Sequence, residues 1–446
     1  MRLTRVAQAS LFDNYSKHEV GVQLKELSRI LDKHPDLLSI IAKDLIASTS
    51  KKTGRTGLSV DSIFRCLLLK QKFQISYEQL AFHLSDSITY RTFARLSYGV
   101  NPSRSGLQST IRKITPASLE KLHTLLSQCW FQSGELSLEK IRIDSTVVAS
   151  NIAPPSDSQL LNDGVRVLSR LLAKSLESIG MKVRFTDKRP AAKSLAFKIF
   201  NAKKAAKDLL YIDLLKIARL VIKQANRGLV CAEARHNKTK EASQWTSKVE
   251  HYNSLLLRII DQTERRVINQ EKVPSSEKLV SIFEPHTDII VKGFRDVQYG
   301  HKINLSSESH GFITHLSIEE GNTADSELFM PVLASHQLIF NQLPNATVAD
   351  GGYASQANVT QGRMLGIKRV VFHKPVGLSL QAMGVKKKTF DALRHFRAGV
   401  EGNISELKRV FGAGKAIWKG YEGFKAFVWS AVLSYNLVRL ARQNSF

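Results

Sequence analysis

Apolar residues between positions 58 and 125 follow the spacing of short amphipathic helices. They recur every three or four positions within 60–68, 80–84 and 90–96. The middle helix should begin after Ser76, which is followed three residues later by a glutamine in the spacing of a capping box. This part of the chain is therefore predicted to be all helical, with short connections.

After residue 140 the pattern becomes that of strands. Residues 141–148 are rich in β-branched side chains and alternate at first, which predicts a strand that ends in a turn-prone segment. Further strands are predicted at 287–292, 300–305, 311–318, 346–350 and 369–372. The second and third of these are separated by a polar turn and should form a hairpin.

Two stretches return to helical spacing. One runs from 160 to about 270, and the other from 391 to 442 with a break at Gly412 and Gly414. Strands, an inserted helical block at about 152–280, more strands and closing helices predict an α/β fold with an insertion.

The charge of the chain points to a polyanionic partner. Lys and Arg number 65 against 39 Asp and Glu, a formal net charge of +26. Nucleic acid is the first expectation and an anionic membrane surface the second, because a polyanion releases counterions when basic side chains neutralise it. Residues 152–280 alone hold 25 basic and 13 acidic residues together with apolar stripes, so the insertion should pack and is a candidate to hold DNA.

Cysteine usage and hydropathy indicate a cytoplasmic protein. Cys66, Cys129 and Cys231 are far apart and lack the spacing of a disulfide framework or zinc module. Residues 1–15 contain no uninterrupted apolar segment of a signal peptide, and the apolar stretch 427–438 is shorter than the ~18–20 residues of a spanning helix. We expect no membrane association.

Basic residues accompany the helices of 58–125, among them Arg91 and Arg95. Short helices with basic surfaces suit a helix-turn-helix-like DNA-binding region. A small helical bundle with solvated basic faces fits the pattern equally well.

Two aspartates lie at the ends of predicted strand segments. Asp144 follows Ile141-Arg-Ile, and Asp350 precedes a Gly-Gly turn. A lone aspartate at such a place is commonly a loop cap. Two of them in so basic a chain favour a divalent metal site, because Mg²⁺ takes one or two carboxylates together with substrate phosphates.

The helix predicted near residue 400 offers a third carboxylate. At ~100° per residue, Arg397, Glu401 and Lys408 fall on a line beside the apolar stripe, whereas Glu406 points to the opposite side. Glu401 is thus expected to face a buried site and Glu406 to face water. The alternative for Arg397 and Glu401 is a surface pair four residues apart.

Several segments carry a resemblance to a known family. Two surround the aspartates, Ile143–Thr146 and Val348–Ser355, and two lie in the predicted central strands, Tyr299–Leu305 and Gly321–Ser326. A fifth is the pattern Arg397-x₃-Glu401-x₆-Lys408. The amino-terminal helices add Tyr77–Leu80 and Tyr90–Phe93. In this order they resemble the DDE insertion-sequence transposases, and the Arg-Glu-Lys pattern is similar to their Y-R-E-K signature. The tyrosine of that signature is replaced here by Arg394.

The resemblance implies an RNase H-like catalytic domain over 139–446, interrupted by the insertion and preceded by a helical DNA-binding region over 1–138. It implies cleavage of transposon ends and their joining to target DNA, with Asp144, Asp350 and Glu401 holding two Mg²⁺ ions, for which Mn²⁺ can substitute. A homodimer or higher oligomer on DNA in the bacterial nucleoid would pair the ends. The candidate DNA contacts are Arg397, Lys408, Arg394, Lys302, Arg91 and Arg95.

Three further residues and one alternative function complete the predictions. Asp325 has no assigned role and is best explained as a helix N-cap before Leu328. His286 and His301 are expected to be hydrogen-bonded structural residues rather than ligands. The competing function is a transposase-derived DNA-binding protein that no longer cuts.

Overall fold

The computed structural model describes residue 4 and residues 15–46, 57–97, 99–234, 239–292, 296–373 and 378–444. Most of residues 1–15, where the sequence predicts no signal peptide, lie outside these ranges. The chain forms two compact units, one of residues 1–150 with 301–446 and the other of residues 151–300. Each unit is described by itself.

The amino-terminal part of the first unit is helical, as predicted. Its helices are α1 (Glu19–Lys33), α2 (Leu38–Ile46), α3 (Val60–Lys72), α4 (Tyr77–Asp86), α5 (Ile88–Phe93), α6 (Arg104–Ile111) and α7 (Pro116–Gln132), with a 3₁₀ turn, η1 (Pro35–Leu37), before α2. The capping box at α4 is confirmed: the Ser76 hydroxyl accepts from the amide of Gln79, whose side chain accepts from the amide of Ser76. Local side-chain caps thus define where these short helices begin.

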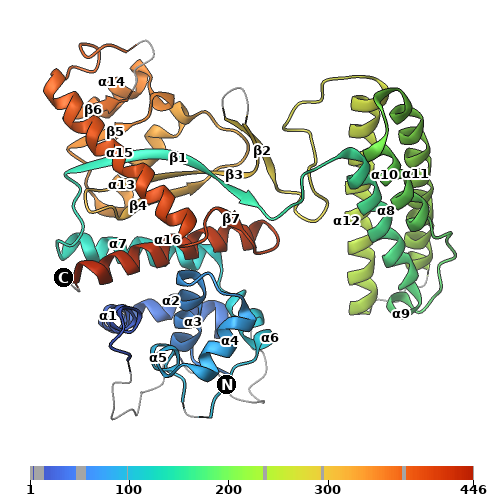
Figure 1. Cartoon of the computed structure of the whole chain (residues 1–446), viewed down its shortest axis with the longest axis horizontal. Coiled ribbons are helices and arrows are strands. Elements are labelled where there is room, and N and C mark those ends of the chain that lie inside the picture. The colour runs from blue at the N-terminus through green and yellow to red at the C-terminus, as the bar shows by residue number, and fades with distance from the viewer. Residues whose placement is uncertain are drawn as a thin grey trace. The chain divides into compact units, whose positions relative to one another are not determined.

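A mixed sheet forms the rest of the first unit (Figure 1). Its strands are β1 (Lys140–Ser150), β3 (Asp296–Ser307), β4 (Ile313–Ile318), β5 (Ala346–Ala349), β6 (Arg369–Phe372) and β7 (Lys415–Ala416). β1, β5 and β6 are parallel neighbours, β7 pairs parallel to β1, and β4 pairs antiparallel to β3 as the predicted hairpin. The α/β class is confirmed, whereas β7 escaped prediction because two residues carry no periodicity.

Helices cover the sheet and close the chain. They are α13 (Phe329–Phe340), α14 (Gln356–Met364), α15 (Lys387–Arg409) and α16 (Tyr421–Asn444), with short 3₁₀ turns at η3 (Asp325–Glu327) and η4 (Gly351–Tyr353). The break between α15 and α16 includes the predicted glycine loop. No helix within the described ranges is long and apolar enough to cross a membrane.

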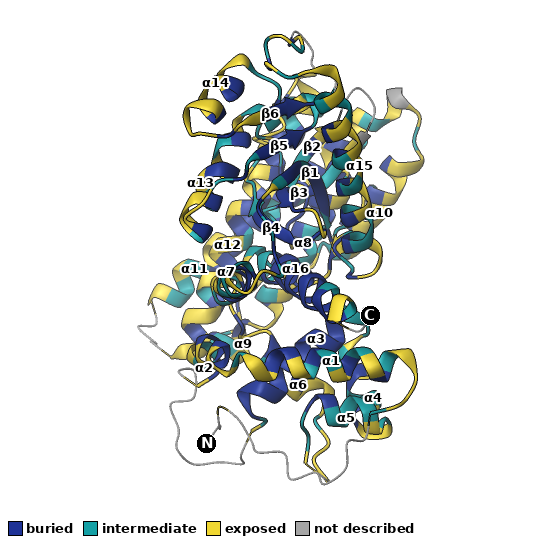
Figure 2. Ribbon diagram, turned by 90° about the vertical axis from the view of Figure 1, so that its left-hand side faces the viewer, coloured by how far each residue is buried: buried dark blue, intermediate teal, exposed yellow. Residues whose placement is uncertain are grey.

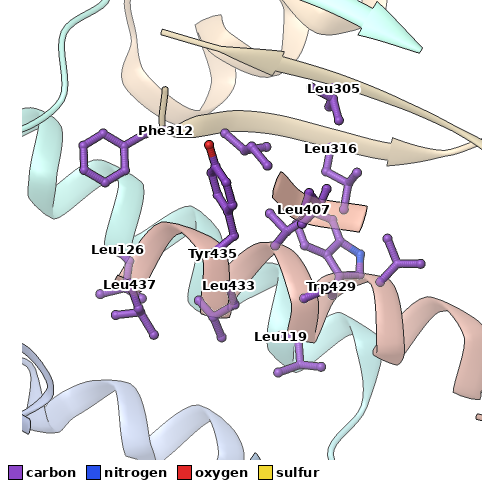
Figure 3. Packing of buried hydrophobic residues seen from close by; sticks show 14 of the residues in the cluster. Leu119, Leu126, Leu305, Phe312, Leu316, Leu407, Trp429, Leu433, Tyr435 and Leu437 are labelled. Atoms are coloured by element: carbon purple, nitrogen blue, oxygen red, sulfur yellow. The ribbon is translucent and has the colours of Figure 1, made fainter. Parts of the chain in front are cut away.

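Helix α16 organises the core of this unit. Almost all of its residues between 424 and 441 are buried, so it packs on every side, as a helix with no polar face must. Figure 3 shows side chains of α7, α16 and the β3–β4 hairpin meeting in one apolar layer. The Tyr435 hydroxyl donates to the carbonyl of Gly311 over 2.9 Å, which satisfies its polar atom inside that layer.

The second unit is a bundle of helices with its own core. Its helices are α8 (Asp157–Ala173), α9 (Ser175–Ile179), α10 (Arg189–Asn201), α11 (Lys204–Ala234) and α12 (Lys240–Thr263), followed by the π-helical turn η2 (Glu264–Ile268). Apolar residues of α8, α11 and α12 form most of the core, and the Trp245 indole donates to the carbonyl of Leu171. Strand β2 (Asp288–Lys292) pairs antiparallel with the start of β3.

Candidate functional site

The register of two parallel strands places the two aspartates side by side. Ile143 of β1 is paired with Ala349 of β5, so Asp144 and Asp350 are the next residues on neighbouring strands. Asp350 directly follows the end of β5. Asp144 lies inside β1, which continues to Ser150, so its expected place at the end of a strand segment is wrong. The pair therefore sits where β5 stops and β1 runs on.

Helix α15 contributes an arginine that meets all three candidate acids. The Nη2 atom of Arg397 lies 3.1 Å from Asp144 Oδ2 and 3.7 Å from Asp350 Oδ1, and its Nη1 lies 2.9 Å from Glu401 Oε1. The Arg397 side chain is only 10% exposed, whereas Asp350 and Glu401 are 44% and 64% exposed. Strands β1 and β5 and helix α15 thus bring together the predicted acids around one guanidinium.

A close contact between α15 and β1 fixes the position of that arginine. A Cβ atom on Gly399 would overlap the guanidinium of Arg142. Arg142 in turn donates to Ser307 Oγ over 3.0 Å and to the carbonyl of Phe396 over 3.0 Å. Glycine at 399 leaves room for the guanidinium of Arg142 between α15 and β1. A glycine in a helix facing a buried arginine is a signal that periodicity alone does not show.

Glu406 does not face water as expected. Its carboxylate pairs with Arg439 over 3.2 Å and with Arg442 over 2.5 Å, both on α16. The expectation was wrong because it treated α15 as an isolated helix, whereas α16 packs beside it. Glu401 and Glu406 still lie in different surroundings, Glu401 with Arg397 and Glu406 with the α16 arginines.

A second polar cluster supports the aspartates from behind, and sequence reasoning missed it. Asp325 Oδ1 accepts from Ser145 Oγ over 2.9 Å and from Lys302 Nζ over 3.1 Å. Its other oxygen, Oδ2, would lie 2.9 Å from a Cβ on Gly352, two residues after Asp350. Asp325 is therefore not the N-cap that was expected, since α13 has no side-chain cap. We call Ser145, Lys302 and Asp325 the supporting cluster.

Tyr353 completes the buried side of the site. Its hydroxyl donates to Asn304 Oδ1 over 2.8 Å. Burial raises the pKa of Tyr353 well above its ordinary value, and the negative charges of Asp325 and Asp144 raise it further. His373 lies on the open side, with Nδ1 3.9 Å from Asp350 Oδ1. The tyrosine is thus a neutral hydrogen-bond donor under the acids.

The other predicted DNA contacts lie in varied settings. Lys302 is buried and donates to the carbonyl of Thr323 over 2.6 Å as well as to Asp325. Arg394 is exposed and Lys408 half-buried on α15. Arg91 donates to the carbonyls of Leu84 and Ser97 and to Asn101, each over 2.8 Å.

Arg95 joins a buried ion network of the amino-terminal helices. It pairs with Asp32 and, over 2.9 Å, with Asp61, while Arg65 pairs with the same two acids. Neither Arg91 nor Arg95 comes together with the acids at 144 and 350 in the contacts of the described residues.

The two histidines lie in structural surroundings, and the expected hydrogen bond is seen for His286. His286 Nε2 lies 3.0 Å from Glu284 Oε2. His301 is 2% exposed and packs on the rings of Tyr421 and Phe424, with centroids 4.9 and 4.8 Å away. Neither lies in a group with metal-ligand geometry among the described residues.

The chemistry of the donor set fits a hard divalent cation. Asp144, Asp350 and Glu401 offer only carboxylate oxygens, the ligands that Mg²⁺ prefers. All three direct an oxygen at one cationic group, Arg397, so the site already draws positive charge. Within the described ranges no three acids, histidines or cysteines are close enough together to form a ready-made metal site. The acids would have to close around an ion in place of the guanidinium.

Comparisons with known proteins indicate the family of the chain. A family model described as "Transposase DDE domain" matches residues 297–437, which include Asp350, Arg397 and Glu401. A second, described as "Transposase domain (DUF772)", matches residues 15–112 of the amino-terminal helices. No curated protein and no solved structure matches the chain. On these two matches, the chain belongs to the DDE family of insertion-sequence transposases.

Proposed function

We propose that this protein cleaves DNA at the ends of a bacterial insertion sequence and joins those ends to target DNA, using Asp144, Asp350 and Glu401. The convergence of these three carboxylates on Arg397 is the observation that carries the proposal. The mixed sheet, with β1 between β3 and β5 and with α15 packed on β1, is compatible with an RNase H-like core.

The three acids would hold two Mg²⁺ ions, with Mn²⁺ as a substitute. When bound, such ions supply Lewis acidity at the scissile phosphate and lower the pKa of the attacking hydroxyl or water. The carboxylates come from two strands and one helix, so the rigid sheet fixes two of them and α15 the third. Glu401 is the most exposed of the three and therefore has the most freedom to adjust.

Arg397 supplies a fixed positive charge at the same place. Its guanidinium offsets the mutual repulsion of the acids while no ion is bound. When ions take its place between the acids, the guanidinium would turn to a phosphate beside the scissile bond. Lys408 and Arg394 would extend this positive surface along the DNA.

The supporting cluster would keep the aspartates in register. Ser145 follows Asp144 directly and donates to Asp325, and Gly352, two residues after Asp350, has no room for a Cβ beside the same carboxylate. Asp325 therefore lies against the segments that carry both aspartates. Lys302 neutralises Asp325 over 3.1 Å and is itself buried. Asp325 and Lys302 would act as positioning residues, because they contact the neighbours of the acids and not the reacting atoms.

The test is cleavage of a labelled duplex that carries the element's own terminal sequences. Wild-type protein should cut at the end with Mg²⁺ and not with EDTA, and Asp144→Asn should bind the same duplex without cutting. A wild-type protein that binds but does not cut with either Mg²⁺ or Mn²⁺ would overturn the proposal and favour a DNA-binding protein derived from a transposase.

A further inference from the structure

A basic pocket lies in the first unit, apart from the three acids. Its volume is about 260 Å³, and its walls come from α3, α4, α6 and the segment that follows β7. Four cationic residues line it, Lys70, Arg104, Arg112 and Lys419, against a single acid, Glu78. Such an excess of positive charge in a concave site favours an anionic ligand.

The cations reach the pocket from elements that are tied together. Arg112 of α6 donates to the carbonyl of Lys419 over 3.1 Å, which joins the amino-terminal helices to the segment before α16. Lys70 of α3 is 4% exposed and donates to the carbonyl of Ile75 over 3.0 Å. The pocket is therefore part of the fold and not a chance cluster of mobile surface side chains.

The described contacts of the buried Lys70 ammonium are with uncharged groups. This ammonium lies 4.8 Å from the centre of the Tyr77 ring and contacts a carbonyl, and none of its contacts within the described ranges is with a carboxylate. Burial lowers the pKa of Lys70 to about 8. An anion in the pocket would stabilise the charged form of this side chain.

Ser76 and Gln108 add polar groups to the lining, and the segment after β7 adds an apolar wall. Trp418 packs against Phe427 with ring centroids 5.9 Å apart, and Ile417 beside it is 52% exposed. A ligand that combines a phosphate with a less polar part would use both kinds of wall. DNA backbone has this composition, because each phosphodiester is flanked by sugars.

We propose that this pocket binds a backbone phosphate of DNA, with the neighbouring sugar against Ile417. The proposal rests on the proposed function only in taking DNA as the partner. It adds a contact that spans the amino-terminal helices and the segment between β7 and α16. DNA held here would be anchored to the same unit that carries Asp144, Asp350 and Glu401.

The experiment measures binding of a fluorescent duplex with the element's terminal sequence, in EDTA so that no cleavage occurs. Lys419→Gln and Arg104→Gln remove exposed charges from the pocket, and Lys415→Gln removes an exposed charge four residues before Lys419 that does not line it. We expect each pocket variant to weaken binding roughly threefold to tenfold and to reduce the salt slope by about one. Lys415→Gln should have a smaller effect on both the affinity and the salt slope.

Glu78→Gln is expected to change DNA affinity in the opposite direction, so it controls for misfolding. Glu78 lies 3.8 Å from Arg104 and is 78% exposed, so Glu78→Gln removes the one competing acid without disturbing a core. Binding should become tighter by roughly twofold to fivefold, because the pocket gains a full unit of positive charge. A folding defect would not produce tighter binding.

Neutral methylphosphonates at single positions of the duplex then identify the contact. One position should weaken binding of the wild type, and the same substitution should have no further effect on the Arg104→Gln, Lys419→Gln double variant. Pocket variants that bind like Lys415→Gln, or a Glu78→Gln that binds no tighter, would overturn the pocket while leaving the proposed cleavage intact. A wild type that binds no DNA would overturn both.

Discussion

Arg397 meets three carboxylates that come from three separate elements. Its two terminal nitrogens contact Asp144, Asp350 and Glu401 within 3.7 Å, in a setting where it is itself almost buried. The contact with Asp144, which is 16% exposed, is screened least by water, whereas those with Asp350 and Glu401 are open to solvent. Glu401, and not Glu406, is proposed as the third acid, and substitution of each glutamate distinguishes the two.

Glu401→Gln and Glu406→Gln should have opposite consequences. Glu401→Gln should abolish cleavage and leave the free energy of unfolding within ~0.5 kcal/mol, because the residue is largely exposed. Glu406→Gln should keep cleavage and lower that free energy by ~1–2 kcal/mol, because Arg439 and Arg442 lose a partly buried partner. Cleavage assays and denaturant unfolding measure both. Loss of cleavage only in Glu406→Gln would show that the wrong glutamate was chosen.

Asp325→Asn should slow cleavage without weakening DNA binding. The amide still fits between Ser145 and Lys302 but no longer neutralises the buried ammonium, so the segments that carry Asp144 and Asp350 lose a support. We expect a rate ~10–100-fold lower at an unchanged Kd. Asp325→Glu should recover part of the rate. Equal losses in Asp325→Asn and Asp325→Glu, or a raised Kd, would contradict a positioning role.

At the residue scale, the sequence contained enough to choose the three acids but not their support. Strand and helix patterns placed Asp144, Asp350 and Glu401, since each lies in or beside a periodic segment. Asp325 could not be found in this way. Its partner Ser145 is 180 residues away, and a long-range hydrogen bond leaves no local pattern.

At the scale of elements, the approach of α15 to β1 determines where Arg397 and Glu401 can lie. Two glycines three residues apart on α15 differ sharply in their surroundings. A Cβ on Gly399 would overlap Arg142, whereas a Cβ on Gly402 has no atom within 4 Å. This pair therefore separates the effect of helix propensity from the effect of the contact.

Gly399→Ala should displace the guanidinium of Arg142 from its hydrogen bonds to Ser307 and to the carbonyl of Phe396, which join β1 to α15. We expect the free energy of unfolding to fall by ~1–3 kcal/mol and cleavage to fall at least tenfold. Gly402→Ala should instead raise it by ~0.5–1 kcal/mol, because alanine favours the helix and meets open space. Thermal unfolding with parallel cleavage assays measures both. Equal behaviour of the two variants would show that the close approach is not required.

Elements with a regular pattern were predicted well, and those defined by packing were not. The capping box at Ser76 and the β3–β4 hairpin depend on neighbouring residues, so they appear in the sequence. The burial of α16 depends on α1, α3 and α7 packing around it, as the dark blue helix in Figure 2 shows. The helical spacing of residues 391–442 did not show that Ser430, Ser434 and Asn436 are buried together with the apolar residues of α16.

At the scale of the whole molecule, the first unit is stabilised by a core that contains neutral histidines. Burial lowers the pKa of His123 and His336 to about 4 and that of His315 to about 3. His123 joins three elements, since its Nε2 contacts the carbonyl of Ile313 at 2.8 Å and lies 3.2 Å from Asn436 of α16.

The first unit should therefore lose stability in mild acid. The unfolded chain takes up protons on these histidines below their ordinary pKa of about 6.5, whereas the folded chain does so only near pH 4. The free energy of unfolding is therefore highest above pH 6.5 and falls as the pH drops below it. The loss should be about 2 kcal/mol per histidine at pH 5. Denaturant unfolding from pH 8 to pH 5 measures it.

Two histidine variants serve as controls for this pH dependence. His123→Gln should reduce the slope of stability against pH by about one proton, and His395→Gln, at an exposed position, should leave it unchanged. A wild-type stability that stays level between pH 7 and pH 5 would contradict the account of the core.

In the proposed function, Asp144, Asp350 and Glu401 hold a divalent metal together. The most direct measurement replaces Mg²⁺ by Fe²⁺ and generates hydroxyl radicals with ascorbate and peroxide, which cut the protein backbone close to the bound ion. We expect cuts near residues 144, 350 and 401, suppressed by excess Mg²⁺ and absent in Asp144→Asn. Cuts confined to other parts of the chain, or the same cuts in Asp144→Asn, would contradict the claim.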